Sequence, residues 1–250
     1  MALIRDAVPG LGLEVLLLMR PANSTFAPRV EVFPGGSVDP ADFDPGWTKM
    51  APEVASKSSV ATHLLVTAVR ETFEECGILL ARDEQGEPCP PGLIARLQTL
   101  RQGVSDGDPA ALGRGLRDHG LRPAWEDLYF CAHWVTPDGL PRIFDTRFFL
   151  AGLPTGQRPS GDERREVESL RWTAPGTALE EARCGDAQLL PPTRAVLESL
   201  TQHQSVAAAL RATAEAVVRR IKPRLEEVTV ARYPGLDLST VRPGPEGDKD

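Results

Sequence analysis

The feature that most limits how this chain can fold is an apolar stripe at helical spacing that ends at a glycine. Between His63 and Cys76, apolar residues recur every three or four positions, at Leu64, Leu65, Ala68, Val69 and Phe73. Ser59 or Thr62 can cap the start of such a helix, and Gly77 can end it. The pattern therefore predicts a helix over residues 63–76 with one face turned to a core.

Three acids occupy a second face of this predicted helix. Glu71, Glu74 and Glu75 stand at positions i, i+3 and i+4, so their side chains project together. Like charges at this spacing repel each other, and a hard divalent cation, Mg²⁺ or Mn²⁺, would compensate them. The alternative is a solvated acidic helix face without a ligand.

Two short apolar segments precede the helix. Residues 13–20 have strand length and predict a strand buried on both faces, and residues 30–33 predict a second strand. Pro34, Gly35 and Gly36 end the second strand. Residues 37–59 are rich in Pro, Asp, Ser and Gly, which predicts a long loop near a site.

The later part of the chain mixes both periodicities. Strands are predicted at residues 128–135, 144–151 and 170–173, and helices at 93–102, 110–119, 192–200 and 206–221. The residues Thr136, Pro137, Asp138 and Gly139 form strong turns, so the first two strands should pair antiparallel. The Pro- and Gly-containing end of the chain should be irregular.

Composition excludes several classes of protein. A chain of 250 residues that is 41% hydrophobic can bury a core without disulfides, and Cys76, Cys89, Cys131 and Cys184 lack the spacing of a zinc or redox motif. The net charge of −7, without a basic stripe, argues against a nucleic-acid partner, and no apolar run has membrane-spanning length. We therefore expect a cytoplasmic protein with reduced thiols and no membrane partner.

The glycines and the acidic helix together resemble a known motif. Phe33-Pro34-Gly35-Gly36, followed by Arg70-Glu71-Thr72-Phe73-Glu74-Glu75-Cys76-Gly77-Ile78, is similar to the Nudix box. Asp42 stands where the box has glutamate, the spacer that follows is longer, and Thr72 replaces an aliphatic residue. The resemblance implies a hydrolase that uses divalent metal ions.

The long spacer resembles one branch of that superfamily, the mammalian peroxisomal coenzyme A diphosphatases. Further similar segments are residues 16–20, 32–39, 144–149 and 190–193. The implied fold is α/β of the α+β type, with a mixed sheet sandwiched between helices. We expect one Nudix domain over residues 1–225, a box-loop insertion at 43–62, a helical insertion near 83–125 and an irregular tail at 226–250.

The resemblance also assigns roles to residues. Metal would be bound by the carbonyl of Gly36 and the carboxylates of Glu71, Glu74 and Glu75. Glu74 and Glu75 would also be catalytic. Glu163 or Glu166, from a later loop, would be a further catalytic residue. Arg70 would support the box by pairing with Asp42, or with Asp39 or Glu53 instead, and Gly35 and Gly77 would shape its backbone. Arg20 and Arg29 would contact substrate phosphates.

These roles predict metal-dependent hydrolysis of a diphosphate linkage in a nucleoside diphosphate derivative. Coenzyme A or acyl-coenzyme A is the leading substrate, giving adenosine 3',5'-bisphosphate and phosphopantetheine or its acyl form. Other nucleotides, such as ADP-ribose, NADH or dinucleoside polyphosphates, remain alternatives, as does a non-catalytic nucleotide sensor. The expected partner is a small nucleotide substrate, and a homodimer is a further candidate assembly.

Overall fold

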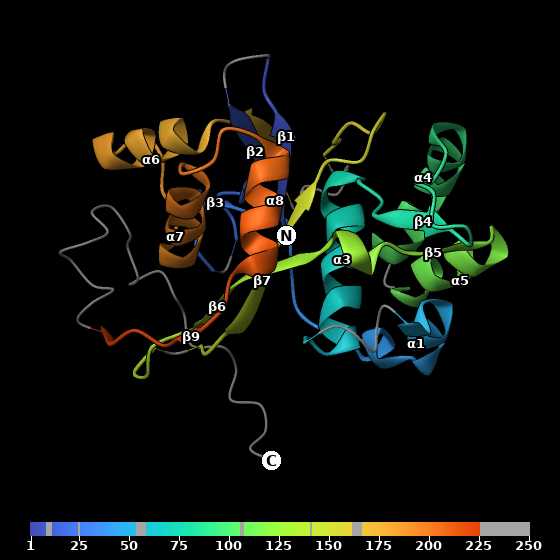
Figure 1. The fold of residues 1–250 in the computed structure, drawn as a ribbon. Coiled ribbons are helices and arrows are strands. Elements are labelled where there is room, and N and C mark those ends of the chain that lie inside the picture. Colours follow the sequence, from blue (N-terminus) through green and yellow to red (C-terminus); the bar gives the residue numbers. More distant parts are fainter. Residues whose placement is uncertain are drawn as a thin grey trace.

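Helices cover both faces of one mixed β-sheet in the computed structural model, which describes residues 1–8, 12–24, 26–53, 59–105, 108–140, 142–161 and 167–225 (Figure 1). The strands are β1 (Ala2–Asp6), β2 (Leu13–Met19), β3 (Glu31–Val32), β4 (Ala81–Asp83), β5 (Leu121–Pro123), β6 (Tyr129–Val135), β7 (Asp145–Gly152), β8 (Ser169–Thr173) and β9 (Arg220–Ile221). The α-helices are α1 (Pro45–Met50), α3 (Thr62–Cys76), α4 (Pro91–Ser105), α5 (Ala110–Asp118), α6 (Pro175–Cys184), α7 (Pro191–Leu200) and α8 (Val206–Glu215), and η1 (Pro40–Phe43) and η2 (Trp125–Asp127) are 3-10 helices.

Strand β1 joins the two halves of the sheet. It is antiparallel to β2, with Ile4 opposite Val15, and parallel to β7, with Ala2 opposite Leu150. The order along the sheet is β3-β2-β1-β7-β6-β9, and β8 pairs antiparallel with β2. Strands β6 and β7 form the antiparallel pair that the turn residues predicted. Because parallel and antiparallel pairs occur together, the sheet is mixed, as expected.

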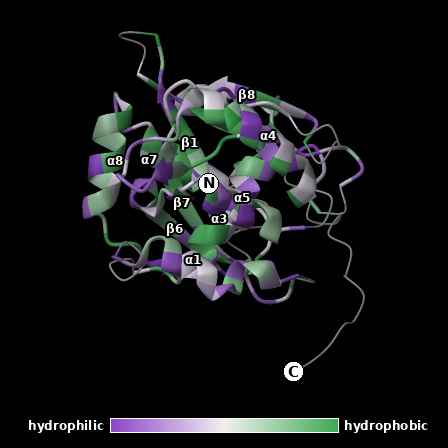
Figure 2. Ribbon diagram, turned by 90° about the vertical axis from the view of Figure 1, so that its right-hand side faces the viewer, coloured by the Kyte–Doolittle hydropathy of each residue, from purple (hydrophilic) through white to green (hydrophobic). Residues whose placement is uncertain are grey.

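Strand β2 is buried on both faces, which confirms the prediction from its apolar run. Leu16 packs into the core that the sheet shares with α3, whereas Val15 and Leu17 pack into the core shared with α6 and α7. Each fully buried side chain of this size contributes about 1.5–3 kcal/mol. In Figure 2, β1 is coloured hydrophobic, while α8 carries hydrophilic residues along its outer side. The alternation of β2 side chains thus fixes α3 on one face of the sheet.

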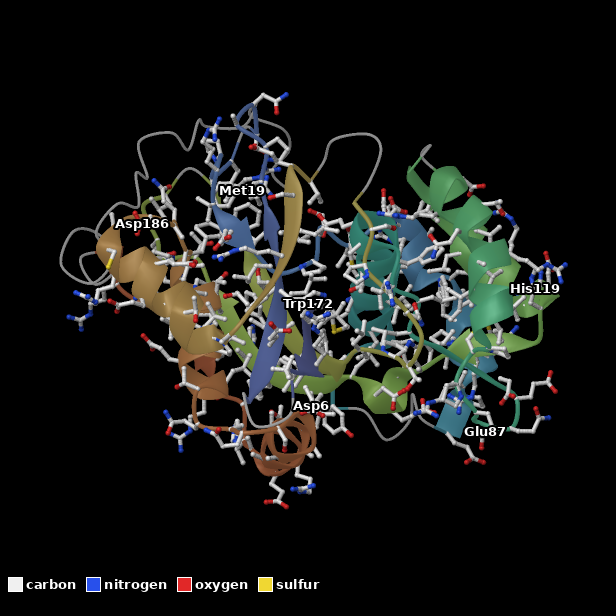
Figure 3. The ribbon with its side chains drawn as sticks, turned by 90° about the horizontal axis from the view of Figure 1, so that it is seen from above. Asp6, Met19, Glu87, His119, Trp172 and Asp186 are labelled. Atoms are coloured by element: carbon white, nitrogen blue, oxygen red, sulfur yellow. The ribbon has the colours of Figure 1, made fainter. Side chains whose placement is uncertain are left out.

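Helix α4 packs against α3 on the side away from the sheet (Figure 1). Helices α4 and α5 lie beside each other, and the short pair β4–β5 connects them to the rest of the chain (Figure 1). Gly115 permits the close approach, because a Cβ there would stand 1.9 Å from Leu100 Cδ1. Seen from above, His119 lies at the outer edge of the region that α4 and α5 form (Figure 3). The two helices occupy the segments in which they were predicted.

The long loop predicted at residues 37–59 was wrong in part, because η1 and α1 form within it. The Asp39 side chain accepts from the Ala41 amide at 2.8 Å and caps η1, and the Asp44 side chain accepts from the Gly46 amide at 2.7 Å and caps α1. Trp47 is then buried against Gly113 of α5. Local capping and one aromatic anchor therefore order residues 40–50, whose composition resembles a loop, while residues 54–58 of the predicted loop lie outside the described residues.

Other boundaries also differ from the predictions. The helix predicted at 206–221 ends at Glu215, and residues 220–221 instead form β9 beside β6. Helix α3 begins after Ala61 with no side-chain cap, so neither Ser59 nor Thr62 caps it. The short strands β1, β4 and β5 and the helix α6 were not predicted. The predicted irregular tail, 226–250, lies outside the described residues, and none of the described helices is long and apolar enough to cross a membrane.

Candidate active site

The glycine turn after β3 lies directly against the acidic face of α3. The Gly35 amide donates to Glu75 Oε2 at 2.7 Å. A Cβ on Gly36 would stand 2.5 Å from the carboxylate of Glu71, so only glycine leaves room for that side chain. Gly35 has a φ of +151°, which glycine adopts without strain. The two glycines are therefore required for the acidic helix to approach the turn this closely.

Arg70 ties the preceding segment to the helix. Its Nε and Nη2 donate to the two oxygens of Asp42, each at 2.9 Å, and Nη2 also donates to the Ser37 carbonyl at 3.0 Å. Of the three acids that the sequence left open as partners, Asp42 forms this pair. Both side chains are buried, since Arg70 is 4% and Asp42 1% exposed. A bidentate pair of this kind holds both segments in one geometry.

The third nitrogen of the Arg70 guanidinium, Nη1, faces two of the glutamates of α3. Nη1 donates to Glu71 Oε1 at 2.8 Å and lies 3.4 Å from Glu74 Oε2. Burial alone would lower the pKa of Arg70, but the hydrogen bonds and charges of Asp42 and Glu71 raise it above its ordinary value. Arg70 is therefore a fixed positive charge between Asp42 and the acidic face of α3.

Burial raises the pKa of two of the three glutamates. For Glu71, desolvation and the charge of Glu74 outweigh Arg70 and raise the pKa to about 7. For Glu75, desolvation and the charge of Glu71 outweigh the Gly35 amide and raise the pKa to about 8. These carboxylates are thus short of compensating positive charge.

The donor set fits a hard divalent cation in its chemistry, because every side-chain donor is a carboxylate oxygen. The glycine cradle around Glu71 and the deficit of positive charge are the features that favour such an ion. Among the described residues, however, no three acidic, histidine or cysteine side chains surround one point as metal ligands. Glu71 accepts from Arg70 through Oε1 and Glu75 accepts from the Gly35 amide through Oε2, so each hydrogen bond uses one of the two oxygens of its carboxylate.

The remaining predicted site residues are placed unequally. Arg20 lies within electrostatic reach of Glu75, and its Nε donates to the Phe26 carbonyl at 3.0 Å. Desolvation lowers the pKa of Arg20, and the charge of Glu75 opposes this shift. Arg29 does not join the acids of α3. Its side chain is 69% exposed, and its Nη1 lies 3.9 Å from Glu168 Oε1.

Two further predicted residues, Glu163 and Glu166, lie outside the described residues. Gly77 ends α3 in the left-handed conformation, with a φ of +69°, and its amide donates to the Phe73 carbonyl. The stop signal read from the sequence is therefore confirmed.

Thr67 is a site residue that sequence reasoning missed. Its hydroxyl donates to Asp42 Oδ2 at 2.7 Å and so supports the oxygen that also receives Arg70 Nη2. Thr67 lies three residues before Arg70 on α3, so helical spacing places both on one side of the helix. That spacing was the available signal, but nothing local indicated that Asp42 would lie opposite it.

The mixed sheet, the glycine turn and the acidic helix together define a Nudix domain. A solved structure agrees: a Nudix hydrolase from Alicyclobacillus acidocaldarius superposes with a TM-score of 0.68 and 30% sequence identity, over 84% of this chain and 92% of that one. The NUDT19 Nudix domain model matches residues 58–198, more than half of the sequence. The chain belongs to the Nudix hydrolase family.

Curated relatives include two vertebrate acyl-coenzyme A diphosphatases named NUDT19. The protein of Gallus gallus is 28% identical over 222 residues, covering 72% of this chain and 58% of the relative. The protein of Homo sapiens is 28% identical over 228 residues, covering 74% of this chain and 59% of the relative. The chain thus spans less than two thirds of the length of these relatives.

Proposed function

We propose that this protein hydrolyses the diphosphate linkage of coenzyme A or an acyl-coenzyme A, with Mg²⁺ or Mn²⁺ as cofactor. The products would be adenosine 3',5'-bisphosphate and phosphopantetheine or its acyl form. The observation that carries the proposal is the packing of Glu71 and Glu75 on Gly36 and Gly35, with Arg70 fixed behind them by Asp42. The names of the curated relatives support coenzyme A as the substrate class.

The reaction adds water across a P–O–P bridge. The water oxygen forms a bond to one phosphorus, the bridging P–O bond breaks, and a proton of the water passes to a base. Glu71, Glu74 and Glu75 would hold the cation, with the carbonyl of Gly36 as a further ligand. When bound, the cation would polarise the phosphate oxygens and make the attacking water more acidic.

Other groups of the chain have separate tasks in this mechanism. Arg70 and Asp42 keep α3 in register with the glycine turn, so that the carboxylates reach the same region. Arg20 would neutralise a substrate phosphate, since it carries a positive charge near Glu75. Glu74 or Glu75 would accept the proton, with Glu163 or Glu166 as alternatives from the later loop.

The test is product release, followed by mass, from coenzyme A, an acyl-coenzyme A, ADP-ribose, NADH and nucleoside triphosphates. Each substrate is incubated with Mg²⁺, with Mn²⁺ and with a chelator, and Glu74→Gln is the catalytic control. We expect cation-dependent release of adenosine 3',5'-bisphosphate from the two coenzyme A substrates, and its loss in the variant.

Other outcomes would revise different parts of the proposal. Turnover of ADP-ribose or NADH alone would keep the reaction and reject coenzyme A as substrate. Nucleotide binding by calorimetry without turnover of any substrate would reject the enzyme and favour a nucleotide sensor.

A further inference from the structure

Side chains of helix α4 hydrogen-bond to the last turn of α3 and to the residue that follows it. Arg101 Nε donates to the Glu74 carbonyl at 2.8 Å, and Gln98 Nε2 donates to the Gly77 carbonyl at 2.9 Å. The last carbonyls of a helix have no partner within that helix and need one from elsewhere. Helix α4 provides that partner for the turn that carries Glu74 and Glu75.

The same guanidinium also binds a segment that follows β7. Arg101 Nη1 donates to Ser160 Oγ and Nη2 to the Ser160 carbonyl, both at 3.0 Å. The Ser160 amide in turn donates to the Cys76 carbonyl at 3.0 Å. Arg101 therefore joins three parts of the chain, namely α4, the end of α3 and residues near 160.

Gln157 strengthens this attachment just beyond the end of α3. Its side chain donates to the Leu79 carbonyl at 2.7 Å and accepts from the Leu79 amide at 2.8 Å, and Gln157 is 8% exposed. Space around Gly77 is filled by the same groups, since a Cβ there would lie 3.0 Å from Arg101 Nη1 and from Ser160 Oγ. Residues that are distant in sequence thus surround the end of α3.

The charge of Arg101 suits this position as well. The carbonyl end of a helix carries partial negative charge, which a cation stabilises. Three acids on the same helix add to that negative charge. A guanidinium that donates to three acceptors fixes direction as well as charge, which a flexible ammonium does less well.

We propose that Arg101 is a positioning residue for the hydrolase, which fixes Glu74 and Glu75 by clamping the last turn of α3 to α4 and Ser160. It acts through a backbone carbonyl of α3. The inference rests on the proposed function for its catalytic consequence, but the clamp itself is tested on the free protein.

The first measurement is amide hydrogen exchange of the free protein with Arg101→Met. Arg96→Met is the matched control, because Arg96 is an exposed arginine on the same helix. We expect exchange at the Ser160 and Gly77 amides to become at least tenfold faster in Arg101→Met and to stay unchanged in the control. Unchanged exchange at both amides in Arg101→Met would overturn the clamp.

The second measurement separates kcat from KM with the substrate that the wild type cleaves. A displacement of the acids on the order of 1 Å lowers kcat by up to about 100-fold, so we expect a kcat loss of tenfold or more, with KM within threefold. Arg101→Lys should recover part of kcat because it keeps the charge and one donor nitrogen. A normal kcat in Arg101→Met, or a loss confined to KM, would overturn the positioning role.

Ser160→Ala covers the case in which Arg101→Met does not fold, because Ser160 is exposed and its hydroxyl is only one of the acceptors of Arg101. The Gly77 amide should then exchange faster and kcat should fall severalfold, and no change in either would reject the proposal. Failure of the wild type to turn over any substrate would reject the proposed function, while the exchange result would still decide the clamp.

Discussion

Replacing Gly36 with alanine should damage catalysis far more than folding. The added Cβ would stand 2.5 Å from the Glu71 carboxylate, whereas real Cβ contacts stay above 3.0 Å, so the carboxylate must move by about 0.5 Å or more. Gly36 has no positive φ, so the backbone tolerates alanine. Misplacement of a reacting group by about 1 Å costs up to about 100-fold. We expect kcat/KM to fall by roughly 10- to 100-fold, or about 1.4–2.7 kcal/mol of barrier.

The assay compares initial rates and thermal unfolding for Gly36→Ala and for Gly176→Ala. Gly176 lies in the first turn of α6, and no atom beyond its chain neighbours and the nearby backbone of its own helix lies within 4 Å of an added Cβ, so the same substitution there should leave kcat/KM unchanged. The unfolding midpoint of both variants should stay within a few degrees of the wild type. A Gly36→Ala enzyme with kcat/KM within threefold of the wild type would show that the cradle around Glu71 does not serve the reaction.

Three further perturbations test the Arg70–Asp42 pair, the buried acids of α3 and the packing of α5 on Trp47. Asp42→Asn removes the carboxylate that binds the buried Arg70 through two hydrogen bonds and leaves Glu71 and Glu74 as its charged partners. The free energy of unfolding in urea should fall by about 1.5–3 kcal/mol, and a loss below about 1 kcal/mol would contradict the structural role of the Arg70–Asp42 pair. In a chelator, the folded-state pKa values of Glu71, about 7, and Glu75, about 8, lie above the ordinary 4.5, so the stability that these two groups contribute should be complete below about pH 4.5 and be lost as pH rises through 8. Mg²⁺ should restore the unfolding midpoint most strongly at the alkaline end, and a midpoint that rises with pH in chelator would contradict the assignment. Gly113→Ala places a Cβ 2.9 Å from the ring of buried Trp47 and should lower the free energy of unfolding by about 1–3 kcal/mol, whereas Gly103→Ala, whose Cβ meets Ala111 at 3.4 Å, is the control.

The parts of the fold that the sequence predicted well are those in which a local pattern and burial agree. Strand β2 carries an unbroken apolar run and lies between two cores, and α3 has an apolar face and a glycine stop. Helix α6 escaped prediction because its short segment has few apolar residues, with Ala178 and Ala182 buried where larger side chains would give a signal. Strand β9 escaped for a different reason, since its two residues form a strand only by pairing with β6.

The sequence by itself determined the acidic helix, its glycine end and the glycine turn, because helical spacing and left-handed backbone are local properties. It also indicated the Nudix family through those same residues. Only the tertiary structure decided that Asp42 is the partner of Arg70 and that Arg101 and Ser160 enclose the end of α3. These contacts join residues between 27 and 59 positions apart, and such distances close only when both segments pack on a common core, which no local pattern encodes.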